Sequence, residues 1–391
     1  KIVDFYTTFD SFGYFFGNIT KALGFKPNRH EGKISALAAY GDAEKFNHII
    51  DQIIRFKDEK FELQMGKYYL PWLVGESDLP DLYEEIKKNS KEDVAAAAQS
   101  FLEKTITKYV DKCIKKYNNS EPTNIVLSGG VFSNIKLNQK IRQMENVSSV
   151  FVQPAMGDMG IPLGSCLAQM AKDGNPYKNF LNNMSLGPSF SNKEIKKILD
   201  KKNIVYKELN NIAKEVVDCI NSSNVVGFFN GRMEFGPRAL CNRSILYHCR
   251  DKDINIWLNK RLERTDFMPF APVTTEELAE KCFIDWSTED RSGDFMTMTY
   301  NVSKIFADIC PAAVHIDGTA RPQIVRKNDN ALMHNIITQY HNLTGELALI
   351  NTSFNNHEDP IVCDVYDALN SFENKNVDVL IIEKFKVGDD I

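Results

Sequence analysis

Residues 230–244 read NGRMEFGPRALCNRS and follow directly after the apolar stretch 225–229, which predicts a buried strand. Three arginines, one glutamate, two glycines and one proline fall within these fifteen residues. Guanidinium groups pair bidentately with phosphate and carboxylate oxygens, while Gly and Pro fix the backbone that aims them. The stretch, called the arginine loop below, therefore predicts a stiff anion-binding loop; a solvated surface turn is the alternative.

The first part of the chain alternates predicted strands and helices. Residues 91–117 form the clearest helix, because apolar positions recur every three or four residues and acidic residues open the segment. Short apolar strands are predicted at 124–127 and 149–152, and helical patterns follow them at 134–144 and 161–171. Two successive strand–turn–helix units predict α/β architecture.

A segment rich in Asn, Gly and Pro, residues 173–188, interrupts this periodicity and is the best linker candidate. It divides the chain into a first domain at 1–172 and a second domain at 189–391. In the second domain the patterns predict helices at 192–202, 212–222, 252–262, 330–343 and 365–374, and strands at 225–229, 295–300, 347–350 and 379–382.

Composition narrows the class of protein. With 391 residues, 43% of them hydrophobic, the chain can bury a sizeable core. A formal net charge of −5 argues against nucleic acid as a partner and favours small molecules. The eight cysteines include no CxxC pair, so we expect reduced thiols in a cytoplasmic protein. The first residues mix acidic and apolar side chains, so we expect neither a signal peptide nor a membrane span there. A homo-oligomer is compatible with these features.

Two glycine-containing turns follow predicted strands of the first half. Ser128, Gly129 and Gly130 let the backbone approach a flat or anionic ligand, although an ordinary tight turn has the same pattern. Asp158, next to Gly157, offers a hard oxygen ligand suited to a divalent metal. Capping the helix at 161–171 is the alternative role for Asp158.

Further polar side chains occur at the ends of predicted elements. Glu31 and Lys33 lie in the polar segment NRHEGK, for which a solvated turn is the alternative. Lys260 and Arg264 end the predicted helix at 252–262, where cations also favour the helix dipole. Arg321, Ser353 and Asn355 add donors in the second half, and their convergence with the arginine loop would form a pocket for phosphate-type anions.

The arginine loop, as GRMEFGPRALCNRSIL, resembles the signature of the O-carbamoyltransferases, which move a carbamoyl group from carbamoyl phosphate onto a hydroxyl. Six further blocks resemble that family in the same order: NRHEGKISALAAYGD (28–42), LSGGVFSNIKLNQKI (127–141), QPAMGDMGIPLGS (153–165), RTDFMPFAPV (264–273), DGTARPQIV (317–325) and NTSFNNHEDPIVC (351–363). Seven ordered blocks are far more specific than a single glycine motif.

The resemblance implies a fold and a reaction. It implies a partial actin-like ATPase (ASKHA) type domain at 1–172, followed by a YrdC-like α/β domain at 189–391. In the YrdC-like domain, carbamate released from carbamoyl phosphate would attack ATP to give carbamoyl-adenylate and pyrophosphate. The actin-like domain would then transfer the carbamoyl group to a hydroxyl of a small molecule or saccharide.

The resemblance also implies residue roles. It assigns catalytic neutralisation of anions to Arg238, Arg243, Arg264 and Arg321. Substrate binding falls to Arg232, Glu234, Asn242, Lys260, Ser353, Asn355, Glu31 and Lys33. Nucleotide binding falls to Ser128, Gly129, Gly130, Asn134 and Gly157.

The resemblance implies ATP as a cosubstrate and iron or another divalent metal as a cofactor, with Mg²⁺ a further candidate. Asp158 would be one metal ligand, and two histidines from a stretch that precedes this region in the family would be the others, upstream of Lys1. Two positions depart from the family pattern. Cys241 replaces a common Gly, and Met268 replaces an arginine of some members, so we expect a different acceptor.

Two other functions stay open at this point. A threonylcarbamoyl-tRNA modification enzyme combines the same two folds, and RNA binding with a steep salt dependence would favour it. A non-catalytic nucleotide-binding fragment would bind ligands without releasing pyrophosphate.

Overall fold

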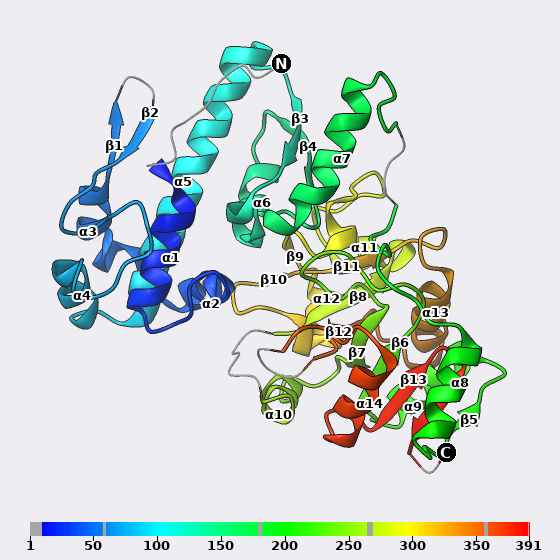
Figure 1. Ribbon diagram of the computed structural model, residues 1–391. Helices are drawn as coiled ribbons and strands as arrows, with labels where there is room; N and C mark the ends of the chain where they lie inside the picture. Colours follow the sequence, from blue (N-terminus) through cyan, green and yellow to red (C-terminus); the bar gives the residue numbers. More distant parts are fainter. Residues whose placement is uncertain (1–9, 58–59, 179–181, 264–268, 356–358, 390) are drawn as a thin grey trace. The chain divides into compact units, whose positions relative to one another are not determined.

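The computed structural model describes residues 10–57, 60–178, 182–263, 269–355, 359–389 and 391 (Figure 1). Arg264 and Met268 lie outside the described residues. The chain divides into two compact units, Lys1–Val152 and Gln153–Ile391, so that residues 153–172 group with the second unit. Among the described residues, no helix has the length and apolarity needed to cross a membrane.

The first unit is built around one long helix, α5 (Lys91–Asn118). Ser90 caps its start by accepting from the amide of Asp93, and Asn119 ends it in the left-handed conformation. The remaining helices and strands are α1 (Phe12–Ala22), α2 (Glu31–Leu37), η2 (Ala38–Tyr40), η3 (Ala43–Lys45), α3 (Asn47–Ile53), β1 (Ile54–Lys57), β2 (Lys60–Leu63), α4 (Pro80–Lys87), β3 (Thr123–Leu127), η4 (Gly130–Ser133), α6 (Ile135–Arg142) and β4 (Val147–Val152).

Strands β3 and β4 pair in parallel, with α6 as the crossover between them. This is the strand–turn–helix order that the sequence predicts. The turn after β3 holds the two glycines, and Asn134 caps α6 by accepting from the amide of Leu137.

The second unit contains an eight-stranded mixed sheet in the order β11-β8-β12-β7-β6-β13-β14-β5. Its strands are β5 (Lys207–Glu208), β6 (Val226–Phe229), β7 (Arg243–His248), β8 (Ala271–Thr275), β11 (Gln323–Val325), β12 (Leu349–Ser353), β13 (Val379–Ile382) and β14 (Phe385–Gly388). Every residue of β6, β7, β8 and β13 is buried, as expected of strands covered on both faces.

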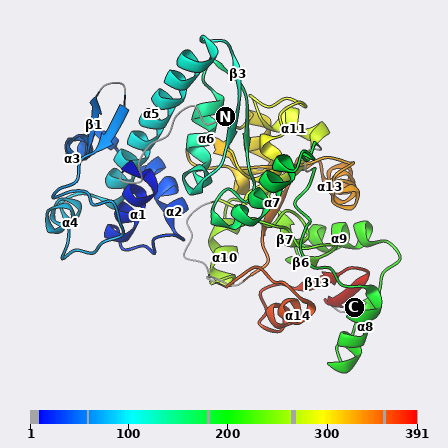
Figure 2. The same ribbon diagram turned by 45° about the horizontal axis from the view of Figure 1, so that its top comes forward.

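Helices cover both faces of this sheet (Figure 2). Helices α9 (Ile212–Asn221) and α13 (Ala331–Thr344) pack together on one face, whereas α10 (Ile254–Arg261) and α14 (Val365–Glu373) lie on the other. The unit also contains η5 (Asp158–Gly160), α7 (Ile161–Lys172), α8 (Asn192–Lys201), α11 (Glu276–Cys282), η6 (Ser292–Phe295), β9 (Tyr300–Asn301), α12 (Lys304–Ile309), η7 (Pro311–Ala313) and β10 (Thr319–Ala320).

The strand predicted at 295–300 is wrong. Residues 292–295 form a 3-10 turn, and Met296 adopts a φ of 57°, which is incompatible with an extended strand. Only the two residues of β9 are extended. The other predicted helices and strands are confirmed with shifts of a few residues at their ends.

Candidate active site

The arginine loop connects two antiparallel strands at the centre of the sheet. It leaves β6 after Phe229 and enters β7 at Arg243, and these two residues are partners in the strand register. Within the arginine loop, residues 230–242 are the thirteen-residue connection of a β-hairpin, and Arg243 and Ser244 begin β7.

Glu234 binds the far end of the same loop. Its side chain is 6% exposed, and Oε1 accepts hydrogen bonds from the amides of Leu240 (2.6 Å), Asn242 (2.7 Å) and Arg243 (3.2 Å). Burial raises the pKa of this carboxyl group, while the amide donors lower it. The sequence predicts substrate binding for Glu234, but the structure uses its carboxylate inside the loop.

A second carboxylate holds the beginning of the loop. Glu383, directly after β13, accepts from the amide of Gly231 at 2.7 Å and from the side chain of Asn230 at 3.0 Å. No sequence motif marks Glu383, since only the parallel pairing of β6 with β13 brings it here.

Part of the predicted linker packs against the arginine loop. The amides of Gly187 and Met233 bind Met233 O and Pro188 O, at 2.8 and 2.9 Å, and Phe235 N binds Met184 O at 2.7 Å. Gly187 lies so close that an added Cβ would be 2.9 Å from Met233 O. Residues 184–188 therefore form one wall of the loop, which Asn and Pro content in the sequence does not reveal.

Arg243 is fully buried beneath the loop. Its guanidinium donates to the carbonyl oxygens of Asn230 (3.1 Å), Gly231 (3.2 Å) and Pro188 (3.3 Å), and it stacks 3.5 Å from the ring centre of Phe229. Burial lowers the pKa of Arg243. Because its donors bind the protein's own carbonyls, the geometry favours a loop-organising role over the catalytic role predicted for it.

Arg238 differs from Arg243 in its exposure and its partners. It is half-buried near the tip of the loop, and burial alone lowers its pKa, with no acidic group opposing that effect. Among the described residues its guanidinium forms no hydrogen bond or ion pair. A desolvated cation without a counter-charge is costly, and an anionic ligand would remove that cost.

A buried polar network joins three of the predicted segments. Asn351 donates from Nδ2 to Gln323 Oε1 at 2.6 Å and to Ala239 O at 3.2 Å. The Cys241 thiol donates to the same Gln323 oxygen at 3.1 Å. Ser353 is the register partner of Ser244, so the NTSFN segment lies beside the end of the arginine loop.

The remaining predicted site residues of the second unit differ in their exposure and in their hydrogen-bond partners. Arg232 is exposed and binds Leu186 O at 2.8 Å, whereas Asn242 is buried and donates to Ser185 Oγ at 2.7 Å. Ser353 donates to Asn355 Oδ1 at 2.6 Å. Lys260 is exposed in the last turn of α10, and Arg321 is half-buried between β10 and β11.

The predicted nucleotide residues of the first unit form an open turn. Ser128, Gly129 and Gly130 are exposed, Gly129 has a φ of 118°, and nothing lies within 4 Å of an added Cβ at either glycine. Asn134 is already occupied, because it exchanges two hydrogen bonds with Gln99, at 2.7 and 3.1 Å, besides capping α6. The turn leaves room for a ligand, but the Asn134 amide would have to release Gln99 to contact one.

Glu31 and Lys33 belong to helix α2 rather than to a polar loop. Glu31 Oε1 accepts from the amide of Asn28 at 2.6 Å, which closes the turn before the helix. Lys33 is 7% exposed. The Glu31 carboxylate therefore supports local structure, and the Lys33 side chain is buried in this unit.

Asp158 is exposed in η5, and it does not cap α7, whose N-cap is Gly160. Across the described ranges, no three His, Cys, Asp or Glu side chains gather in a way that could hold a metal ion. The described residues thus form no complete site for the metal that the resemblance implies, and we derive no chemical step through it.

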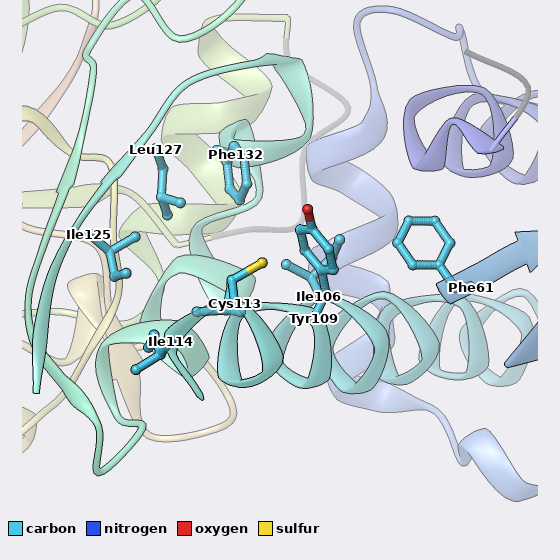
Figure 3. A pocket seen from close by; sticks show the side chains of 9 residues that line it. Phe61, Ile106, Tyr109, Cys113, Ile114, Ile125, Leu127 and Phe132 are labelled. Carbon is cyan, nitrogen blue, oxygen red and sulfur yellow. The ribbon is translucent and has the colours of Figure 1, made fainter. Parts of the chain in front are cut away.

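The first unit also contains an apolar cavity of about 290 Å³ (Figure 3). Side chains from α5 and from the β3 region face each other across it, and the lining consists of Phe61, Ile106, Tyr109, Val110, Cys113, Ile114, Ile125, Leu127 and Phe132. This lining carries no charged group, so the cavity is unsuited to phosphate or carboxylate ligands.

Comparisons with known proteins agree with the motifs. Residues 2–167 match the family model described as Carbamoyltransferase N-terminus, and residues 217–388 match Carbamoyltransferase C-terminus. The chain is 34% identical over 387 residues to the uncharacterized protein MJ1051 of Methanocaldococcus jannaschii, covering 97% of this chain and 72% of that protein. It is 29% identical to nodulation protein NolO of Bradyrhizobium diazoefficiens, covering 91% of this chain and 65% of NolO.

The likeness to solved structures is weaker. A full-length HypF structure in a phosphate- and nucleotide-bound form shares 17% identity with a TM-score of 0.32, covering 46% of this chain and 22% of that one. This similarity is too low to support an argument.

The chain belongs to the carbamoyltransferase family, because the two family matches occur in order and together take in most of its length.

Proposed function

We propose that this chain is an ATP-dependent O-carbamoyltransferase whose second unit makes carbamoyl-adenylate. Family membership supports carbamoyl transfer in general, and nodulation protein NolO is among the relatives. The cosubstrates, the hydroxyl acceptor and the actin-like and YrdC-like identities of the two domains are part of the proposal.

Arg238 carries the proposal. Glu234 and Arg243 are engaged by the loop itself, whereas Arg238 is desolvated and has no partner among the described residues. The guanidinium of Arg238, in the loop between β6 and β7, thus has no counter-charge among the described residues. A phosphate or carboxylate would bind it bidentately.

The proposed reaction has two steps in this unit. Water hydrolyses carbamoyl phosphate to carbamate and inorganic phosphate, and a carbamate oxygen then attacks the α-phosphorus of ATP with pyrophosphate as the leaving group. Arg238 would stabilise the negative charge that builds up on the phosphate oxygens. Ser353 and Lys260 would supply additional donors, and Arg321 a second guanidinium.

The remaining step transfers the carbamoyl group. An acceptor hydroxyl attacks the carbamoyl carbon of the adenylate, and AMP leaves. We assign this step to the first unit, where the open turn at Ser128–Gly130 would hold the nucleotide. A metal with Asp158 among its ligands stays a prediction, and no step of the reaction is assigned to it.

The test compares carbamoyl phosphate with bicarbonate plus threonine as the substrate that reacts with ATP. We expect pyrophosphate release from ATP only when carbamoyl phosphate is added, measured by a coupled phosphate assay after pyrophosphatase treatment with inorganic phosphate subtracted. Efficient replacement of carbamoyl phosphate by bicarbonate plus threonine would favour the threonylcarbamoyl alternative. Nucleotide binding without pyrophosphate release under any condition would favour the binding fragment.

A further inference from the structure

The carboxylate of Glu234 closes the arginine loop from inside. It accepts three amides from residues 240–243, so the segment between, residues 235–239, becomes a short loop tied at both ends. Arg238 is the cation within that tied segment. Three backbone donors converging on one oxygen resemble the concavities in which proteins bind free anions. Here an internal carboxylate fills that position.

This geometry decides between two roles for Glu234. A carboxylate facing the substrate would repel phosphate, whereas a carboxylate used by the backbone fixes the loop. Its other oxygen, Oε2, is buried and has no hydrogen-bond partner in the described structure. The charge of Glu234 raises the pKa of the buried Arg243 guanidinium against the effect of burial, so these two internal charges offset each other. Arg238 is paired with neither of them, so its charge is available to an external anion.

Two more contacts stiffen the tied segment. Gly236 has a φ of 126°, and an added Cβ would lie 3.4 Å from Pro154 O. Ala239 O accepts from Asn351 at 3.2 Å. The backbone on both sides of Arg238 is thus held by contacts outside the loop.

We propose that Glu234 is a positioning residue, an internal anion that holds the arginine loop closed and sets Arg238 to receive a phosphate-type anion. The identity of the physiological anion rests on the proposed function, but the positioning role does not. Glu383 offers a matched control, because it binds Gly231 and Asn230 through the same chemistry at the other end of the loop.

The experiment is a double-mutant cycle on the dissociation constant of inorganic pyrophosphate, measured by calorimetry with the full chain. The four proteins are the unsubstituted chain, Glu234→Ala, Arg238→Ala and the double variant. We expect Glu234→Ala to weaken binding about tenfold or more when Arg238 is present and less than about twofold when it is absent. A merely structural role for Glu234 would give the same loss in both backgrounds and overturn the proposal.

Two further variants keep the test decisive. Glu234→Asp retains the charge but withdraws the oxygen from the amides, and it replaces Ala in the cycle if Glu234→Ala does not fold. Glu234→Gln keeps an acceptor oxygen in place, so we expect affinity within about threefold of the unsubstituted chain. Glu383→Ala should likewise change affinity less than about threefold. A Gln variant as weak as Ala, or a Glu383→Ala loss equal to that of Glu234→Ala, contradicts specific positioning of Arg238.

The outcomes also separate this inference from the proposed function. Coupled pyrophosphate binding without carbamoyl-phosphate-dependent turnover would retain the positioning role and reject the proposed reaction. No pyrophosphate binding by the unsubstituted chain would overturn the positioning role, because Arg238 would then not be an anion site.

Discussion

Asn351 donates a 2.6 Å hydrogen bond to Gln323, across 28 residues of sequence, and the two side chains are buried. This contact ties the first residue of β11 to the middle of β12, while Cys241 adds the arginine loop to the same oxygen. Three segments that each carry a predicted site residue therefore share one polar core. Asn351 Oδ1 has no hydrogen-bond partner in the described structure, so the network is not fully satisfied, but the shared Gln323 oxygen holds the three segments together.

Arg238→Lys should abolish most carbamoyl-phosphate-dependent pyrophosphate release while the fold is retained. Lysine keeps the charge but lacks the planar fork, and we expect a loss on the order of 10²-fold. The measurement is the initial rate at saturating ATP, with circular dichroism as the folding check. The control is Arg261→Lys, since Arg261 pairs with both oxygens of Asp378 at 2.9 and 2.8 Å. It should lower stability by about 1 kcal/mol and keep the rate. Equal losses in both variants would remove Arg238 from the site.

Arg243→Gln should mainly destabilise the second unit. The carbonyl oxygens that Arg243 now binds would lose a charged donor, and the buried Glu234 would lose its opposing charge. We expect the free energy of unfolding to fall by about 3 kcal/mol, measured by urea denaturation. Unchanged stability with lost activity would instead return Arg243 to a direct catalytic role.

Cys241 stands at a backbone position that favours glycine. Its φ is 75°, where an L side chain costs about 1 kcal/mol. Cys241→Gly relieves this strain, whereas Cys241→Ala keeps it, and both lose the thiol contact with Gln323. Gly should therefore be at least as stable as Ala in thermal unfolding, although it removes one more methyl group. A Gly variant clearly less stable than Ala would show that side-chain packing outweighs backbone strain here.

The stability of the second unit should depend on pH through His248. Burial lowers the pKa of His248 to about 4, and its Nδ1 has no hydrogen-bond partner in the described structure. The unfolded chain then binds the proton more tightly than the folded chain, so stability falls as pH drops from about 6.5 towards 4. Thermal unfolding across this range should show a shallower dependence for His248→Leu. Identical slopes for His248→Leu and the unsubstituted chain would contradict this assignment.

Apolar periodicity predicts about half of the described helices and strands, because burial and local geometry impose it together. The strand at 379–382 and the helix at 91–117 are examples, since each has a continuous pattern and clear ends. Strands β8 and β11 were missed because Pro272 and polar residues such as Gln323 obscure the pattern. Met296 adopts a left-handed backbone conformation, which is incompatible with the strand that the apolar pattern predicts at 295–300.

The sequence indicates which segments lie together around the candidate site, but it does not indicate the contacts of each side chain. The arginine loop and the NTSFN segment lie together as the motifs imply, because β7 and β12 are neighbours. The sequence does not show which arginine donates hydrogen bonds to carbonyl oxygens of the protein itself, because Arg238 and Arg243 both lie in the same polar, glycine-containing motif. Glu383 and residues 184–188 carry no motif, so only the folded chain reveals that they support the loop.

The most direct test of the account is to follow the carbamoyl carbon itself. The chain would be incubated with ATP and ¹³C-labelled carbamoyl phosphate, and the nucleotide products analysed by mass spectrometry. The account predicts ¹³C in an AMP adduct with the mass of carbamoyl-adenylate, together with pyrophosphate. Formation of ADP and phosphate, with the label absent from every nucleotide, would contradict it.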